Sequence, residues 1–173
     1  QAGAAAPQDV QILNTALGAE LEAIAAYQLG AESQLLQKPA LDLALSFQAH
    51  HKEHAEVLAK TVEKLGGKPV AAKAAYGFPA EQLKSQADVL RFAARLEQGA
   101  VSAYLGAVPL FGNRDLSKAA ASILGDEAMH WDDVKELYAD RALAIIEQNA
   151  PGLARKILGR AVFSPLDLER ANP

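Results

Sequence analysis

Apolar residues recur at three- and four-residue steps along four long stretches of the chain, which is the spacing of one face of an α-helix. The helices that this pattern predicts cover residues 7–34, 39–65, 81–108 and 116–149. Helix-breaking residues stand at their ends, with Gly66 and Gly67 after the second helix and Pro109 after the third. Few stretches alternate with period two, so no sheet is expected.

The lengths of the connections predict how these helices are arranged. Short links join the first helix to the second and the third to the fourth, whereas residues 68–82 form a longer link. This order is typical of an all-α, antiparallel four-helix bundle with a long crossover between its second and third helices. We expect a disordered N-terminal segment over residues 1–6, the bundle over residues 7–150 and a short C-terminal helical tail over residues 151–173.

The composition narrows the classes of function. A length of 173 residues, with 50% hydrophobic side chains, suffices for one domain with a substantial core. The formal net charge of −4 argues against a nucleic-acid partner, because such proteins present an excess of Lys and Arg to the phosphates. No run approaches the roughly 20 apolar residues of a membrane-spanning helix. The absence of cysteine excludes disulfides, thiolate zinc sites, iron–sulfur clusters and a cysteine nucleophile.

The first seven residues, QAGAAAP, are small and mostly apolar. Such a stretch is typical of the residues that follow the cleavage site of an exported protein, so a periplasmic or otherwise exported location is expected. A chain trimmed for another reason would look the same, and a cytoplasmic location is the alternative.

Two predicted helices carry a carboxylate in the middle of an apolar stripe. Glu20 stands in the apolar stripe of the first helix, and Glu97 holds the matching place in the third. Tyr27 and Tyr104 each follow seven residues later, so the two helices repeat one pattern. Burying an ionised carboxylate without a partner costs several kcal/mol, so each needs a positive charge beside it.

The second and fourth helices repeat another pattern, a pair of polar residues three positions apart. His51 and His54 form this pair in the second helix, and Glu127 and His130 form it in the fourth. Residues three apart lie on one helical face, so each pair can address one point in the core. Carboxylates and imidazoles suit iron, manganese and zinc, so a metal site is expected. The predicted ligands are Glu20, His51, His54, Glu97, Glu127 and His130.

A Glu on each of two helices and a Glu-x-x-His pair on each of the other two is the ligand scheme of ferritin-like di-iron carboxylate bundles. The chain resembles this superfamily over about residues 7–149, but His51 stands where the family has a bridging glutamate. The resemblance implies two metal ions, iron first, with manganese, zinc or copper as alternatives. We expect Glu127 to be the only bridge between them. The position beside Glu20 and both second-helix histidines is expected to be rich in nitrogen, which either favours copper or zinc or leaves one metal position weakly occupied.

The resemblance also implies a function. It implies a metal-binding protein whose dinuclear site oxidises Fe(II) with O2 or peroxide, as a ferroxidase or related oxidoreductase. One alternative is a non-redox zinc- or copper-binding or stress-protective bundle, and another is a structural bundle with a vestigial site. Export would favour the exported, desiccation-related branch of the superfamily, and a homo-oligomer, dimer or larger, is expected.

Several residues near the predicted ligands have two readings or a lesser role. Tyr27 and Tyr104 are either core aromatics whose hydroxyls bond across the bundle or residues that support redox chemistry from behind the ligands. His50 points about 100° away from the next residue, a predicted ligand, and so lies at the surface or behind a ligand. Asp126 is expected to face solvent and Met129 to fill the core.

Overall fold

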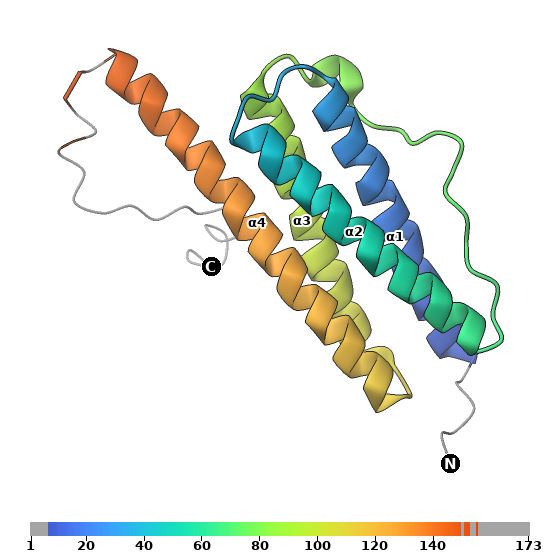
Figure 1. The fold of residues 1–173 in the computed structure, drawn as a ribbon. Helices are drawn as coiled ribbons and strands as arrows, with labels where there is room; N and C mark the ends of the chain where they lie inside the picture. The colour runs from blue at the N-terminus through green and yellow to red at the C-terminus, as the bar shows by residue number, and fades with distance from the viewer. Residues whose placement is uncertain (1–6, 150, 153–154, 156–173) are drawn as a thin grey trace.

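The computed structural model describes residues 7–149, 151, 152 and 155, and these residues form helices and no strands (Figure 1). The four long helices are Pro7–Glu32 (α1), Ala40–Lys64 (α2), Gln86–Ala107 (α3) and Arg114–Asn149 (α4). Two short 3₁₀ turns, Ala80–Gln82 (η1) and Val108–Leu110 (η2), precede and follow α3. The four predicted helices are thus confirmed to within a few residues. The predicted tail lies largely outside the described residues.

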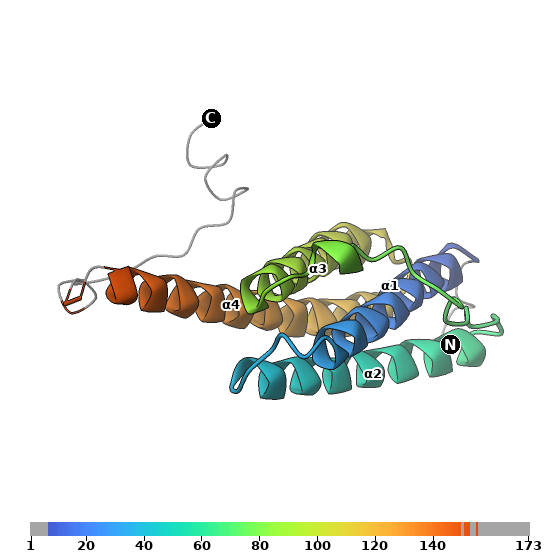
Figure 2. The same ribbon diagram turned by 90° about the horizontal axis from the view of Figure 1, so that it is seen from above.

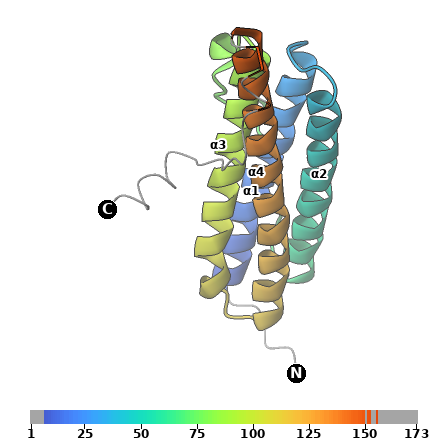
Figure 3. The ribbon, with the colours of Figure 1, turned by 90° about the vertical axis from the view of Figure 1, so that its left-hand side faces the viewer.

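The helices form two antiparallel pairs. Helix α1 packs along α2 and α3 packs along α4, while residues 65–85 run beside α1 from one end of the bundle to the other (Figures 1 and 2). In Figure 3 the axes of the four helices are roughly aligned with one another. This is the predicted four-helix bundle with a long crossover. No helix in the described part of the chain is both long and apolar enough to cross a membrane.

Helix α3 begins later than the periodicity predicts, at Gln86 instead of about residue 81. The cause is Ser85, whose hydroxyl oxygen accepts the backbone N–H of Asp88 at 3.2 Å. The carboxylate of Asp88 in turn accepts the Ser85 hydroxyl at 2.7 Å. This reciprocal cap satisfies a helix N–H that has no partner within the helix, and so fixes where the helix starts.

A buried carboxylate ties α1 to the link between α3 and α4. Asp9, in the first turn of α1, is 1% exposed. Its two oxygens accept the backbone N–H groups of Gly112 and Asn113 at 2.8 and 3.2 Å. The contact joins residues far apart in sequence and holds the start of α4 against α1.

The core consists of two apolar clusters with a polar layer between them. One cluster contains Leu17 and Ile123, and the other contains Tyr27 and Val134. Each helix passes from one cluster to the other through the predicted ligands. Met129 is 59% exposed, so the prediction that it fills the core is wrong. It is exposed because its neighbour along α4 is a predicted ligand that takes the inward direction.

Candidate metal centre

The structure brings together all six predicted ligands in the middle of the bundle. Each helix contributes at least one of them, and none is more than 8% exposed. They are Glu20 from α1, His51 and His54 from α2, Glu97 from α3, and Glu127 and His130 from α4. Their convergence follows from helical register, because the repeated spacings place them at the same height on four inward faces.

The six side chains form two overlapping groups of four, and within each group one ligand atom per residue lies within 4.8 Å of the others. The first group is Glu20, His51, His54 and Glu127, and the second is His51, Glu97, Glu127 and His130. Each group could hold one metal ion. Since His51 and Glu127 belong to both groups, the two positions share two side chains.

The ring of His51 lies between the two groups. Its Nδ1 is 2.7 Å from Oε2 of Glu20, and its Nε2 is 3.3 Å from Oε1 of Glu97. The expectation that Glu127 alone connects the two positions therefore differs from the geometry, because His51 faces both. Each group also contains two histidines and two glutamates, so nitrogen is not concentrated beside Glu20.

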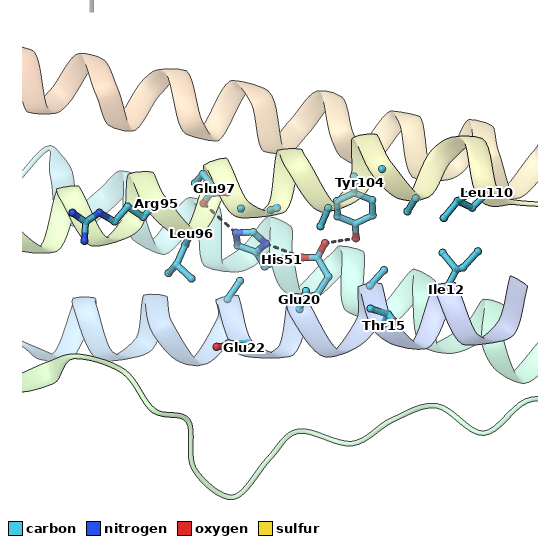
Figure 4. A pocket seen from close by; sticks show the side chains of 18 residues that line it. Ile12, Thr15, Glu20, Glu22, His51, Arg95, Leu96, Glu97, Tyr104 and Leu110 are labelled. Carbon is cyan, nitrogen blue, oxygen red and sulfur yellow. Dashed lines mark hydrogen bonds and ion pairs between the residues drawn. The ribbon is translucent and has the colours of Figure 1, made fainter. Parts of the chain in front are cut away.

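The two tyrosines hold the carboxylates of the opposite helix. Tyr104 on α3 donates its hydroxyl to Oε1 of Glu20 at 2.5 Å, and Tyr27 on α1 donates to Oε1 of Glu97. Figure 4 shows Glu20 between His51 and Tyr104. Burial first, and then the charge of the glutamate that each contacts, raises the pKa of both phenols. Both therefore stay protonated donors, which is the predicted bonding across the bundle.

Two ligand histidines are held from outside by a second side chain. Nε2 of His130 is 2.9 Å from Nδ1 of the exposed His50, and Nε2 of His54 is 3.2 Å from a carboxylate oxygen of the half-buried Asp126. Both rings thereby direct Nδ1 toward the two groups of ligands. Such outer partners fix the tautomer and orientation of metal-binding histidines.

One of these outer residues was expected and the other was missed. His50 is predicted to lie at the surface or behind a ligand, and the structure shows both: its side chain is exposed and its ring contacts His130. Asp126 was predicted to face solvent, and the structure shows that its carboxylate contacts His54. A general rule could have found this contact: metal-binding histidines often donate the N–H of their second ring nitrogen to a carboxylate.

Contacts within the cluster favour the protonated form of the α2 histidines. Burial alone would lower the pKa of His51, but hydrogen bonds to Glu20 and Glu97 raise that pKa to about 10. Burial also lowers the pKa of His54, yet its contacts with Glu127 and Glu20 raise it to about 10. Both imidazoles therefore carry a second proton at neutral pH in the protein without metal.

The carboxylates respond in opposite ways. Burial raises the pKa of Glu20, but contacts with the two α2 imidazoles outweigh burial and leave that pKa below its usual value. Contacts with His130 and His51 likewise outweigh burial and hold the pKa of Glu97 well below its usual range. In Glu127 burial dominates and raises the pKa to about 8, although an α2 imidazole opposes the rise.

These protonation states balance the buried charge without a metal ion. The imidazolium groups of His51 and His54 offset the carboxylates of Glu20 and Glu97. The positive charge that these buried carboxylates need is therefore available from the histidines themselves, without a bound cation. A metal ion needs deprotonated ligands, so its binding would release the protons that otherwise balance the charge.

Several donor atoms of the cluster are buried without a well-formed hydrogen bond, and these atoms fit a metal ion. Among the described residues, five buried side-chain atoms make no hydrogen bond: Nδ1 of His54, Nδ1 of His130, Oε2 of Glu97 and both carboxylate oxygens of Glu127. Their contacts with one another are ion pairs at 3.1 to 4.0 Å. A buried polar atom without a partner costs about 1–3 kcal/mol. All five belong to the two groups of four, and nitrogen and carboxylate oxygen donors are suitable ligands for iron, manganese or zinc.

A four-helix bundle with Glu and His side chains converging from all four helices defines the class of di-metal carboxylate proteins. Comparison with known families agrees. The chain belongs to the ferritin-like domain family, which matches residues 8–139.

Solved structures share this fold. A conserved hypothetical protein from Mycobacterium tuberculosis is 23% identical, with a TM-score of 0.69 over 75% of this chain and 96% of that one. A ferritin-like, diiron-carboxylate protein from Bacillus anthracis is 20% identical, with a TM-score of 0.64 over 75% and 94%. The bacterioferritin of Desulfovibrio desulfuricans, described with a diiron site, is 19% identical, with a TM-score of 0.67 over 90% and 89%. At these identities the likeness concerns the fold alone.

One curated protein matches a short piece of the sequence. The pyridine nucleotide-disulfide oxidoreductase domain-containing protein 2 of Rattus norvegicus is 49% identical over 41 residues. The match covers 23% of this chain and 7% of that protein. It therefore carries no argument about activity.

Proposed function

We propose that the chain binds two metal ions in the two overlapping groups and oxidises Fe(II) with O2 or peroxide. One observation carries this proposal: the ligand atoms of both groups converge, they are buried, and several of them make no hydrogen bond. The likeness to diiron proteins in fold supports iron as the metal. Iron bound there would supply the electrons that reduce the oxidant.

The residues of this chain would bind the metal ions, hold the ligand carboxylates in position and release protons as the metal binds. Tyr27 and Tyr104 each hold one oxygen of a carboxylate on the facing helix, which restricts the rotation of Glu97 and Glu20. His51 would lose a proton when metal binds, and because its side chain is only 1% exposed, this proton would have to leave a buried site. The apolar clusters on both sides limit the access of bulk water to the ligands from the two ends of the bundle.

A second candidate is a zinc- or copper-binding bundle without turnover. The observation that favours it is the equal share of imidazole and carboxylate in each group, since imidazole suits both of those metals. This reading needs neither an oxidant nor an electron donor.

Metal analysis and oxidation of added iron separate the two candidates. The full chain is purified without chelator and its metals are counted per chain, after which Fe(II) is added under argon and the ferric absorbance is followed on mixing with O2 or peroxide. The matched variants are Glu127→Ala, which removes a side chain common to both groups, and Glu53→Ala, which removes an exposed α2 glutamate. We expect rapid oxidation by the parent protein and Glu53→Ala, and a loss of at least about tenfold in Glu127→Ala.

Other results would decide against iron oxidation. Stoichiometric zinc or copper without oxidation of added iron supports the second candidate. Equal oxidation by Glu127→Ala and Glu53→Ala would mean that the oxidation does not occur at this centre.

A further inference from the structure

A cavity of about 640 Å³ lies between α1 and α3 (Figure 4). Its volume is within the range of about 300–1,000 Å³ that is usual for small-molecule sites. It exists because α1 packs mainly on α2 and α3 packs mainly on α4, which leaves the seam between α1 and α3 poorly filled. The walls carry small side chains, among them Ala16, Ala19 and Ala23 of α1 and Gly99, Ala103 and Gly106 of α3.

These small residues do not serve close packing of the two helices. Gly99 and Gly106 are exposed, and a Cβ atom added at either would meet no atom within 4 Å, so the seam is open along this side of α3. Glycine inside a helix is less favourable than alanine, so its presence here lowers the stability of α3 without bringing a neighbour closer. The result is open, mostly apolar space along the seam.

The candidate metal centre forms part of the wall of this cavity. Glu20, His51 and Glu97 all line it. In Figure 4 they lie in the middle of the row of lining side chains, with Ile12 and Leu110 toward one end. A molecule lying in the cavity would therefore pass directly along the ligands.

The opposite end of the row carries a charge suited to an anion. Arg95 lies at this end in Figure 4, is exposed, and has no ion pair with the described residues. Its guanidinium offers a planar set of donors that matches a carboxylate. Glu22 is also part of the lining but lies partway along α1, so an anionic group fits the end at Arg95 better than the middle.

We propose that this cavity binds a single-chain aliphatic molecule with an anionic headgroup at Arg95 and its chain along the alanine and glycine walls, next to the candidate metal centre. The walls are mostly apolar, and in the middle the carboxylates of Glu20 and Glu97 are paired with the ring of His51. A ligand that is apolar along most of its length and anionic at the end near Arg95 fits this lining. Binding itself does not depend on metal. That the ligand is a substrate of the centre rests on the proposed function.

The headgroup is tested by calorimetry on the full, metal-free chain, with each probe below its micelle concentration. Dodecanoate is expected to bind saturably, and dodecanol and dodecyltrimethylammonium at least about tenfold more weakly. In Arg95→Gln the preference for dodecanoate over dodecanol should be lost. Preference for the cationic probe, or an unchanged preference in Arg95→Gln, would overturn the assignment of the headgroup.

The location is tested by filling the cavity. Gly99→Leu adds a large side chain at a residue that lines the seam, and Gly18→Leu is its matched control, because an added Cβ there is equally free but Gly18 is not part of the lining. Dodecanoate affinity should fall at least about tenfold in Gly99→Leu and stay unchanged in Gly18→Leu. Gly106→Leu provides a second filled variant if circular dichroism shows that the first does not fold.

Three outcomes would overturn the proposal. They are the absence of saturable dodecanoate binding by the parent protein, equal binding by filled and control variants, and a change of oligomeric state in Gly99→Leu that identifies the seam as an interface between two copies. Since these measurements use metal-free protein, their failure leaves the iron-oxidation test standing. Failure of that test would equally leave the ligand-binding result intact.

Discussion

His51 is the residue at which this centre departs most from a set of carboxylate ligands. In the metal-free protein its protonated ring contacts Glu20 through one nitrogen and Glu97 through the other. It thus supplies positive charge between two buried carboxylates. When metal binds, the same ring offers nitrogen donors and no negative charge, so the ligands carry less charge than a set with glutamate at this position.

A His51→Glu variant is expected to change both stability and metal preference. Without metal, a fourth carboxylate beside Glu20 and Glu97 replaces an attraction with repulsion, so the free energy of unfolding should fall by several kcal/mol. With metal, the added carboxylate should raise the preference for iron over zinc and copper. Denaturant unfolding measures the first effect, and metal counts after competitive loading measure the second.

The control for this variant is Ala49→Glu, which adds the same charge at an exposed position of α2. It should change the free energy of unfolding by less than about 0.5 kcal/mol and leave the metal preference unchanged. An unchanged metal count and an unchanged metal preference in His51→Glu would contradict the role given to this ring.

At the scale of the helices, the bundle depends on contacts that fix where each helix starts and what it packs against. The clearest example is the contact between the first turn of α1 and the link before α4. Asp9 is buried and accepts two backbone N–H groups of that link, at Gly112 and Asn113. This one side chain therefore connects the two helix pairs at one end of the molecule.

Replacement of Asp9 by alanine should lower the free energy of unfolding by about 1–3 kcal/mol, because two N–H groups lose their acceptor. Asp42→Ala is the control, since Asp42 is an exposed residue of the first turn of α2 paired only with Lys38 at the surface. Its effect should stay below about 1 kcal/mol. Chemical denaturation of both variants measures the difference in the free energy of unfolding. Equal decreases in the two variants would show that the buried contact of Asp9 adds no more stability than the surface pair of Asp42.

The helices themselves follow from the sequence, because a period of 3.6 survives wherever one face of a helix is buried. The start of α3 does not follow from periodicity, since the reciprocal hydrogen bonds of Ser85 and Asp88 decide it. The six candidate ligands are also predictable, because polar residues repeated in apolar stripes must face inward. The exposure of Met129 also follows from helical register, because the next residue, His130, takes the inward direction. The contact of Asp126 with His54 does not follow from register, since it depends on how α2 and α4 approach each other.

At the scale of the whole molecule, the buried cluster links stability to pH. His51 and His54 have pKa values near 10 in the folded protein, above the 6.5 of a free histidine, so they stabilise the fold fully below about pH 6.5. That stabilisation is lost as the pH rises through about 10. The raised pKa of Glu127 acts in the same direction. The lowered pKa values of Glu20 and Glu97 stabilise the fold above about pH 4.5 and lose their effect in acid.

The metal-free protein should therefore become less stable between about pH 6.5 and 10, by several kcal/mol in total. Metal binding displaces the same protons, so the rise in melting temperature on adding metal should grow over this range. Calorimetry of metal-free and metal-loaded protein at a series of pH values measures both trends. A melting temperature that rises with pH in the metal-free protein would contradict the assigned protonation states.

Two side chains, His51 and Glu127, are common to both groups of ligands. Whatever fills one group thereby changes the donors that the other still offers, so the two filling steps are thermodynamically coupled. A calorimetric titration should then depart from the curve of two identical and independent sites. Half-filled molecules would be either scarce or dominant at intermediate loading, depending on the sign of that coupling.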